Sequence, residues 1–185
     1  MKAINLIILL TLFISCSNDK TVTVGYQLMA NPWKYLIAKG KLNALEGKKV
    51  VFKKFSSGAK VINAMASGDI DIAIAGSTPI AAGLSQGLDI KVIWMMEIIG
   101  DAEAFVVKEN INSIKDLIGK KVAVPFGSTT HFHLMLALKN AGISPRDLSI
   151  LNLTPPSIVA SWKKGEIDGA FVWAPALEDI KKSFL

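Results

Sequence analysis

The chain has 185 residues, a formal net charge of +6, a hydrophobic content of 51% and a single cysteine. This length allows one to one and a half domains with a real hydrophobic core. The lysines occur as scattered pairs, which is typical of solvated faces, and no basic stripe is interleaved with aromatic residues. The composition therefore argues against nucleic-acid binding.

The first residues are typical of a lipoprotein signal peptide. A short positive region precedes an apolar stretch over residues 3–14, which is too short to span a membrane as a mature helix. Cys16 stands where such a signal is cleaved and its cysteine lipidated, although Phe13 departs from the usual aliphatic residue. We predict a signal peptide over 1–16, a polar tether over 17–20, and export with membrane anchoring through lipidated Cys16. A plain secretory signal is the alternative.

From residue 21 the chain alternates apolar strands with amphipathic helices. Expected strands in the first half are 21–26, 47–52, 70–75, 88–96 and 104–107. Expected helices are 33–41, one capped at Ser56-Ser57-Gly58, and one opened by Pro79.

The second half continues the same alternation. Asn112 or Ser113 caps a short helix that ends at Ile118, and strands are expected over 122–124, 148–153 and 167–173. Helices are expected after Ser128-Thr129-Thr130, at Pro155-Pro156 and after Ala174-Pro175. Strands that alternate with helices predict parallel βαβ units, so the fold class is α/β.

A repeat relates the two halves. Residues 65–73 and 162–170 both contain a helix end at glycine, followed by an acid-Ile-Asp-x-Ala strand, and a proline opens the next helix. We expect two similar lobes that face each other across a cleft, one over 21–107 and one, incomplete, over 108–185. The alternative is that the order helix, glycine, strand is generic in α/β proteins and does not reflect a repeat.

Three helix starts follow strands in this layout, at Ser77-Thr78-Pro79, Ser128-Thr129-Thr130 and Trp173-Ala174-Pro175. A helix N-terminus leaves up to four backbone N–H groups unpaired and carries about half a positive charge. Such groups, with nearby hydroxyls, can hold a tetrahedral oxyanion. An ordinary set of capped helices is the alternative.

Other candidate residues remain open to two interpretations from spacing alone. Glu103 either faces solvent or pairs with a ligand cation, and Trp173 either lines the cleft or lies in the core. His131 could bind an anion or simply lie on the first helical turn, which is the favoured interpretation for His133. The chain offers no metal-ligand cluster, nucleophile elbow, P-loop or dinucleotide fingerprint.

At these positions the sequence resembles the taurine-binding periplasmic proteins of bacterial sulfonate-uptake ABC transporters. The resemblance covers nearly the whole mature chain. Its densest stretches are 54–59, 66–70, 76–79, 103–108, 116–120, 123–126, 128–131, 150–153, 155–156 and 168–175.

The resemblance implies a two-lobed periplasmic-binding-protein type II architecture with mostly parallel sheets, closing on taurine without catalysis or cofactor. The implied binding residues are Gln27, Ser77, Thr78, Glu103, Ser128, Thr129, Thr130, His131 and Trp173. The sulfonate would rest on the hydroxyl-rich helix starts, and Glu103 would take the ammonium. The implied protein is an exported monomer in the periplasm or at the cell surface, which works with a membrane permease.

Two departures from the family shape this expectation. The region between Tyr26 and Val50 diverges, and family members continue well beyond this length, so we expect the second half of the fold to be missing and taurine binding to be weak. Other alkanesulfonates, nitrate, a thiamine-precursor pyrimidine or a non-functional fragment remain alternatives. A thiamine-pyrimidine synthase is disfavoured by the lone cysteine, and a transcription-regulator effector domain by the export signal.

Overall fold

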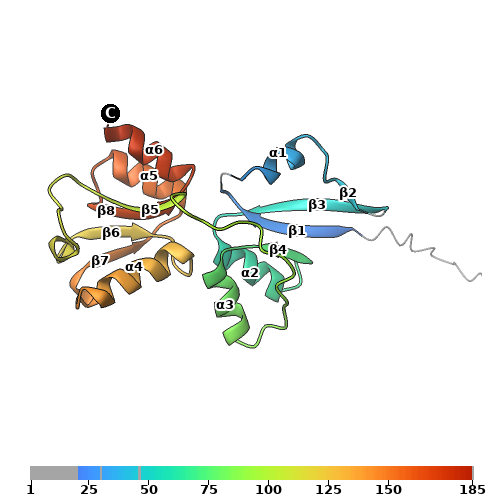
Figure 1. Ribbon diagram of the computed structural model, residues 1–185, viewed down its shortest axis with the longest axis horizontal. Helices are drawn as coiled ribbons and strands as arrows, with labels where there is room; N and C mark the ends of the chain where they lie inside the picture. Colours follow the sequence, from blue (N-terminus) through green and yellow to red (C-terminus); the bar gives the residue numbers. More distant parts are fainter. Residues whose placement is uncertain (1–20, 30, 46, 185) are drawn as a thin grey trace, which may run out of the picture.

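The computed structural model describes residues 21–29, 31–45 and 47–184; the predicted signal peptide, tether and Cys16 lie outside them. Two α/β lobes lie side by side, each built on its own four-stranded sheet (Figure 1). The predicted α/β class with mostly parallel sheets is confirmed. Along the described part of the chain, no helix combines the length and apolar character that a bilayer crossing requires.

The first lobe holds the sheet with strand order β2-β3-β1-β4. Its strands are β1 (Val22–Gln27), β2 (Ala44–Leu45), β3 (Lys48–Phe55) and β4 (Ile72–Ile74). Its helices are α1 (Trp33–Ala38), α2 (Gly58–Ala66) and α3 (Ser77–Ser85). β1 pairs in parallel with β3 and β4, and β2 is antiparallel to β3.

The second lobe holds the sheet with strand order β5-β8-β6-β7. Its strands are β5 (Glu103–Val107), β6 (Lys121–Val124), β7 (Ser149–Asn152) and β8 (Gly169–Trp173). Its helices are α4 (Thr129–Asn140), α5 (Pro155–Lys163) and α6 (Ala176–Lys181), with 3-10 turns η1 (Ile114–Leu117), η2 (Pro145–Asp147) and η3 (Lys182–Phe184). β6 pairs in parallel with β7 and β8, whereas β5 is antiparallel to β8.

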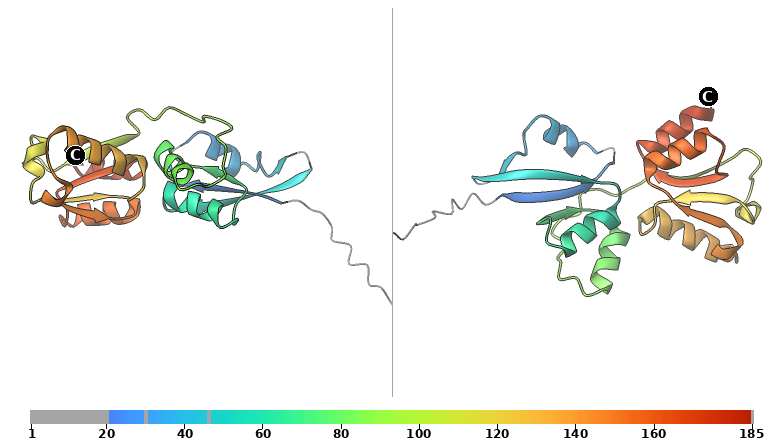
Figure 2. Two further views of the ribbon diagram at one scale, coloured as in Figure 1. Left: turned by 90° about the horizontal axis from the view of Figure 1, so that it is seen from below. Right: turned by 180° about the vertical axis from the view of Figure 1, so that it is seen from behind.

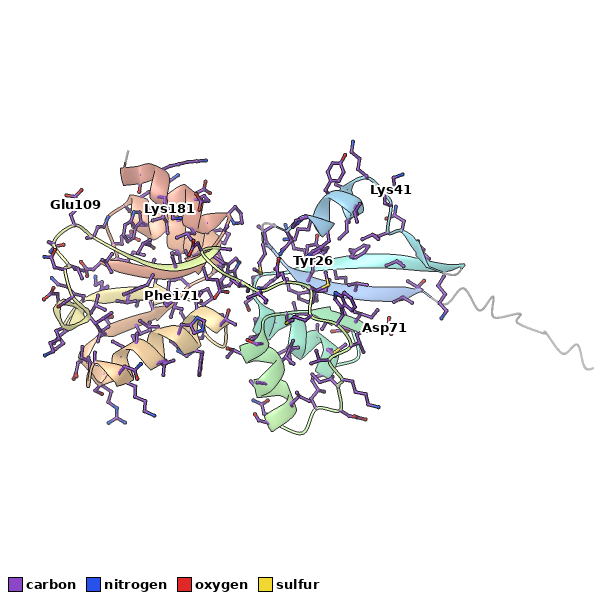
Figure 3. All side chains as sticks on the ribbon, viewed as in Figure 1. Tyr26, Lys41, Asp71, Glu109, Phe171 and Lys181 are labelled. Atoms are coloured by element: carbon purple, nitrogen blue, oxygen red, sulfur yellow. The ribbon has the colours of Figure 1, made fainter. Side chains whose placement is uncertain are left out.

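Helices cover both faces of the second sheet. α5 and α6 lie on one face and α4 on the other (Figure 1). The first face buries a cluster that includes Ile158, Leu177 and Ile180. The other buries Leu134 and Leu138 against the sheet, where Phe171 packs from β8 (Figure 3). Apolar burial on this scale is the main favourable term in folding.

Two sequence predictions about the lobes are wrong. The sequence predicts that the strand over 104–107 belongs to the first lobe, but all five residues of β5 pair with β8, so the first lobe ends before Glu103. The strand expected over 88–96 does not form, and no described strand pairs with this stretch. An apolar β-branched run favours an extended chain, but a strand also needs a neighbour for its backbone groups.

The internal repeat is confirmed in detail. Gly68 and Gly165 end α2 and α5 with φ of +78° and +72°, a left-handed conformation that suits glycine. Asp71 Oδ2 then accepts from Thr23 N at 2.7 Å, and Asp168 Oδ2 accepts from Lys121 N at 2.8 Å. In both lobes, therefore, a glycine and the aspartate that follows it link a helix end to the start of the central strand. We call this arrangement, Gly68 with Asp71 and Gly165 with Asp168, the joint.

Candidate functional site

The predicted residues of the first lobe gather where its parallel strands end. Gln27 is the last residue of β1 and is buried. A Cβ placed on Gly58, at the start of α2, would lie 2.8 Å from Pro79 Cγ and 3.0 Å from Gln27 Oε1. Gln27 and the starts of α2 and α3 therefore meet at one corner, because the carboxyl ends of parallel strands share one edge of a sheet.

The start of α3 meets the start of α4 from the other lobe. A Cβ on Gly76 would lie 3.0 Å from Thr129 Cγ2, and one on Gly127 would lie 3.1 Å from Ala59 Cβ. Glycine at 76 and 127 thus lets the two lobes approach closely. Two of the three predicted helix starts converge at the junction between the lobes.

Both converging starts present unpaired backbone donors. Ser77 N and Thr78 N of α3, and Thr129 N and Thr130 N of α4, donate to no acceptor among the described residues. α3 has nine residues and α4 twelve, so each carries a substantial macrodipole. The junction therefore offers N–H groups from two lobes to an anion.

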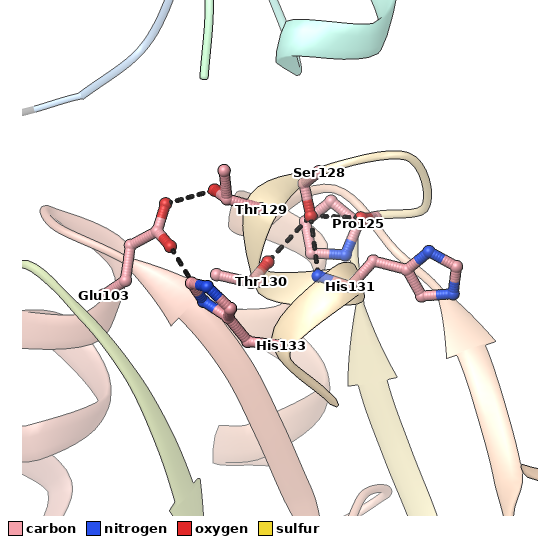
Figure 4. A network of polar contacts seen from close by, with 7 residues as sticks. All are labelled: Glu103, Pro125, Ser128, Thr129, Thr130, His131 and His133. Atoms are coloured by element: carbon pink, nitrogen blue, oxygen red, sulfur yellow. Dashed lines mark hydrogen bonds and ion pairs between the residues drawn. The ribbon is translucent and has the colours of Figure 1, made fainter. Parts of the chain in front are cut away.

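The hydroxyls of α4 are engaged within the protein. Ser128 Oγ accepts from His131 N at 3.1 Å, donates to Pro125 O at 2.5 Å and lies 2.8 Å from Thr130 Oγ1 (Figure 4). Thr130 is fully buried. Ser128 therefore caps the helix and, with Thr130, fixes its first turn, whereas Ser77 at the start of α3 is exposed.

Glu103 lies beside this helix start. Because β5 is antiparallel to β8, its first residue stands opposite Trp173, the last residue of β8. The Glu103 side chain is 6% exposed, accepts from Thr129 Oγ1 at 2.6 Å and lies 3.9 Å from His133 Nδ1 (Figure 4). Burial raises the pKa of its carboxyl, and the Thr129 hydrogen bond and His133 oppose that rise. A buried carboxyl with few compensating partners suits a cationic ligand group.

The His131 imidazole points away from Glu103, on the far side of the helix start (Figure 4). It stacks on Phe126 with ring centroids 4.6 Å apart, and its Nδ1 accepts from Gly127 N at 3.4 Å. Burial lowers the pKa of this imidazole. His131 therefore holds the loop before α4 as a neutral group.

Trp173 is part of the core, as spacing alone favoured. It is 1% exposed, and its Nε1 donates to Leu28 O at 2.8 Å. Leu28 follows β1, so this bond ties the second lobe to the first.

Sequence reasoning missed His133 as a neighbour of Glu103. Thr129 and His133 are four residues apart on α4, so they lie on one helix face and both reach Glu103. That spacing was a usable signal once Glu103 was placed opposite the helix start.

Two cavities lie among the described residues, and neither is lined by a predicted site residue. One, of about 500 Å³, is lined by Lys108, Glu109, Asn110, Trp162, Lys163 and Ser183. Another lies between α2 and α3 beside Gly83 and Leu88. No group of three or more metal-ligating side chains occurs among the described residues.

The sequence profile of the NMT1-like family matches residues 16–178. The chain belongs to the NMT1-like family. It is 47% identical over 161 residues to the taurine-binding periplasmic protein of Escherichia coli (strain K12), a match that covers 87% of this chain and 50% of that protein.

Solved structures show the same fold. The alkanesulfonate-binding protein SsuA from Xanthomonas axonopodis pv. citri, bound to MOPS, matches with a TM-score of 0.78 and 26% identity, over 88% of this chain and 57% of that one. The periplasmic aliphatic sulphonate binding protein SsuA from Escherichia coli matches with a TM-score of 0.65 and 26% identity, over 89% and 57%. The chain thus spans about half the length of the relatives it matches.

Proposed function

We propose that this chain is the taurine-recognising part of an exported solute-binding protein that serves an ABC importer. It would bind its ligand without catalysis or cofactor, as a monomer. The observation that carries the proposal is the convergence of unpaired N–H groups from α3 and α4 beside the buried Glu103 carboxyl. Taurine has the matching chemistry, a tetrahedral sulfonate two carbons from an ammonium.

The sulfonate would accept from Ser77 N and Thr78 N on one lobe and from Thr129 N and Thr130 N on the other. Contacts to both lobes favour the closed arrangement, because a ligand stabilises the state to which it binds more tightly. Gln27 would supply a further polar group from the first lobe. Trp173 would act by tying the two lobes together, and His131 by holding the loop before α4.

The ammonium would pair with Glu103. This pairing would distinguish taurine from competing ligands. A plain alkanesulfonate or nitrate has no cation to offer a buried carboxylate. The likeness to two SsuA proteins makes an aliphatic sulfonate the second candidate.

Export would follow from the signal peptide predicted over 1–16. Lipidation of Cys16 would hold the protein at the membrane near its permease. Mass spectrometry of the mature protein after expression in a bacterial host tests this part separately. A mature N-terminus at Cys16 carrying a diacylglycerol mass is expected, and a free thiol at Cys16 would contradict lipidation.

Calorimetric titration with taurine, ethanesulfonate and nitrate tests the ligand assignment. Ethanesulfonate is the matched control because it lacks only the ammonium. Glu103→Gln should weaken taurine binding by roughly 2–5 kcal/mol, the range for removing one partner of a buried charge pair. It should leave ethanesulfonate binding unchanged. Glu109→Gln, at an exposed acid on the far side of the second lobe, should alter neither (Figure 3).

Taurine binding should also weaken as the pH falls. Glu103 must be ionised to pair with the ammonium, and burial raises its pKa, so the loss begins at a higher pH than for an ordinary glutamate. Equal affinity for taurine and ethanesulfonate would reject the ammonium assignment. Binding of none of the three ligands would favour the non-functional fragment.

A further inference from the structure

The two oxygens of the Glu103 carboxylate have different neighbours on α4. Oε1 accepts a hydrogen bond from Thr129 Oγ1 at 2.6 Å, whereas Oε2 lies 3.9 Å from His133 Nδ1 (Figure 4). That second distance is too long for a hydrogen bond, so Oε2 accepts none among the described residues. Oε2 is therefore open to a ligand donor and stands next to a side chain that can carry a positive charge.

The elements around Glu103 bring no other charge near it. After Glu103, β5 contains only apolar residues, and β8 contains only glycine and apolar residues. No residue of α3, which faces the start of α4 across the junction (Figure 2), can ionise. On α4 itself, His131 points away, and Lys139 lies about 9 Å further along the helix than His133. Asp101, on the turn before β5, is exposed.

His133 combines contact with this site and access to water. Its side chain is 50% exposed, whereas that of Glu103 is 6% exposed. Its ring also lies beside two phenylalanines, with centroids 5.6 Å from Phe132 and 6.1 Å from Phe171. The imidazole is thus held beside the carboxylate by packing and can exchange its proton with solvent.

We propose that His133 sets the charge that the site prefers in a sulfonate ligand. With a neutral imidazole, Glu103 and His133 together carry one negative charge, which favours a sulfonate with an ammonium group. With a protonated imidazole the two charges cancel, which favours a sulfonate without a cation. This inference rests on the proposed function, because it concerns the same ligand and the same carboxylate.

The physical reason is the low polarity of a closed site. A buried carboxylate without a positive partner is costly once water is excluded. Either the ligand ammonium or the imidazolium can compensate Glu103, but two cations beside one carboxylate repel each other. The same repulsion is weaker in the open protein, where solvent screens the half-exposed His133.

Two substitutions fix the charge at this position. His133→Lys places a permanent cation beside Oε2, and His133→Gln places a neutral side chain there. Titration calorimetry with taurine and ethanesulfonate at one neutral pH gives the ratio of the two affinities. We expect His133→Lys to weaken taurine binding roughly tenfold or more and to leave ethanesulfonate binding as tight or tighter. His133→Gln should keep the preference for taurine.

Asn140→Lys is the matched control. It adds the same charge at an exposed position on the same helix, about 10 Å further from the site than His133. That separation exceeds the screening length of about 8 Å at physiological salt, so the affinity ratio should not change. A purely structural role of His133 would weaken both ligands equally and also leave the ratio unchanged.

The failure of this inference is separable from that of the proposed function. An unchanged ratio in His133→Lys, with taurine binding still weakened by Glu103→Gln, would overturn the role of His133 alone. Loss of the taurine preference in His133→Gln would overturn it as well. A wild-type chain that binds neither sulfonate would overturn the proposed function, and the role of His133 with it.

Discussion

The two lobes use the same joint but differ in how much core surrounds it. In each lobe a glycine ends a helix. An aspartate carboxylate then accepts a hydrogen bond from a backbone N–H near the start of the central strand. The second lobe adds two buried clusters, one on each face of its sheet. The first lobe has a small cluster at Val61, Ala64 and Ile70, and α1 buries none of its residues.

The sequence leads us to expect an incomplete second lobe; among the described residues, that lobe holds the larger buried core. β5 joins the edge of the second sheet through antiparallel pairing with β8, and its half-buried Phe105 packs beside Phe171. The first lobe therefore lacks β5, and residues 91–99 make no backbone hydrogen bond among the described residues. A similar sequence motif therefore does not ensure a similar core, because burial depends on which distant segments arrive to cover it.

The largest expected effect compares a helix from each lobe. Leu138 in α4 is fully buried, whereas Leu36 in α1 is 42% exposed. Leu138→Ala should lower the free energy of unfolding by about 2–5 kcal/mol, the usual cost of a core cavity. Leu36→Ala should cost less than about 1 kcal/mol. Urea unfolding of both variants measures the difference, and equal losses would show that the two helices contribute equally.

The next effect tests the bond between the lobes. Trp173→Phe removes the donor to Leu28 O and should cost about 1–3 kcal/mol, because it leaves a carbonyl without its partner. The lobes should also separate, which small-angle scattering would detect as a larger radius of gyration. Trp162→Phe is the control, since Trp162 donates to Ser183 within the second lobe. If both variants had the same radius of gyration, the Trp173 bond would not control the lobe spacing.

The smallest effect probes the shared joint. Asp168→Ala should cost about 1.5 kcal/mol, the lower end of the range for a hydrogen bond to a charged group, because Asp168 is only half-buried. Asp71→Ala should cost about 1 kcal/mol, since Asp71 is exposed and water can replace its hydrogen bond. Thermal unfolding of the two variants ranks them. A larger loss at Asp71 would mean that the first lobe depends more on this joint than its packing indicates.

Much of the candidate site was predictable because its signals are local. Ser128 caps α4 as its sequence indicates, and Ser77 and Thr78 begin α3. Glu103 could be identified as a candidate site residue because it stands at the start of an apolar strand. Its neighbours Thr129 and His133 could not, because they depend on which sheet β5 joins.

By itself the sequence determined the alternation of strands and helices, the glycine helix ends and the repeated joint. Each of these depends on backbone preferences and hydrogen bonds within a few residues or on a short, recurring motif. Only the tertiary structure decided that Glu103 stands opposite Trp173, that Trp173 reaches Leu28, and that residues 88–99 join no described strand. Strand partners and burial are set by segments far apart in the chain, and local preference does not specify them.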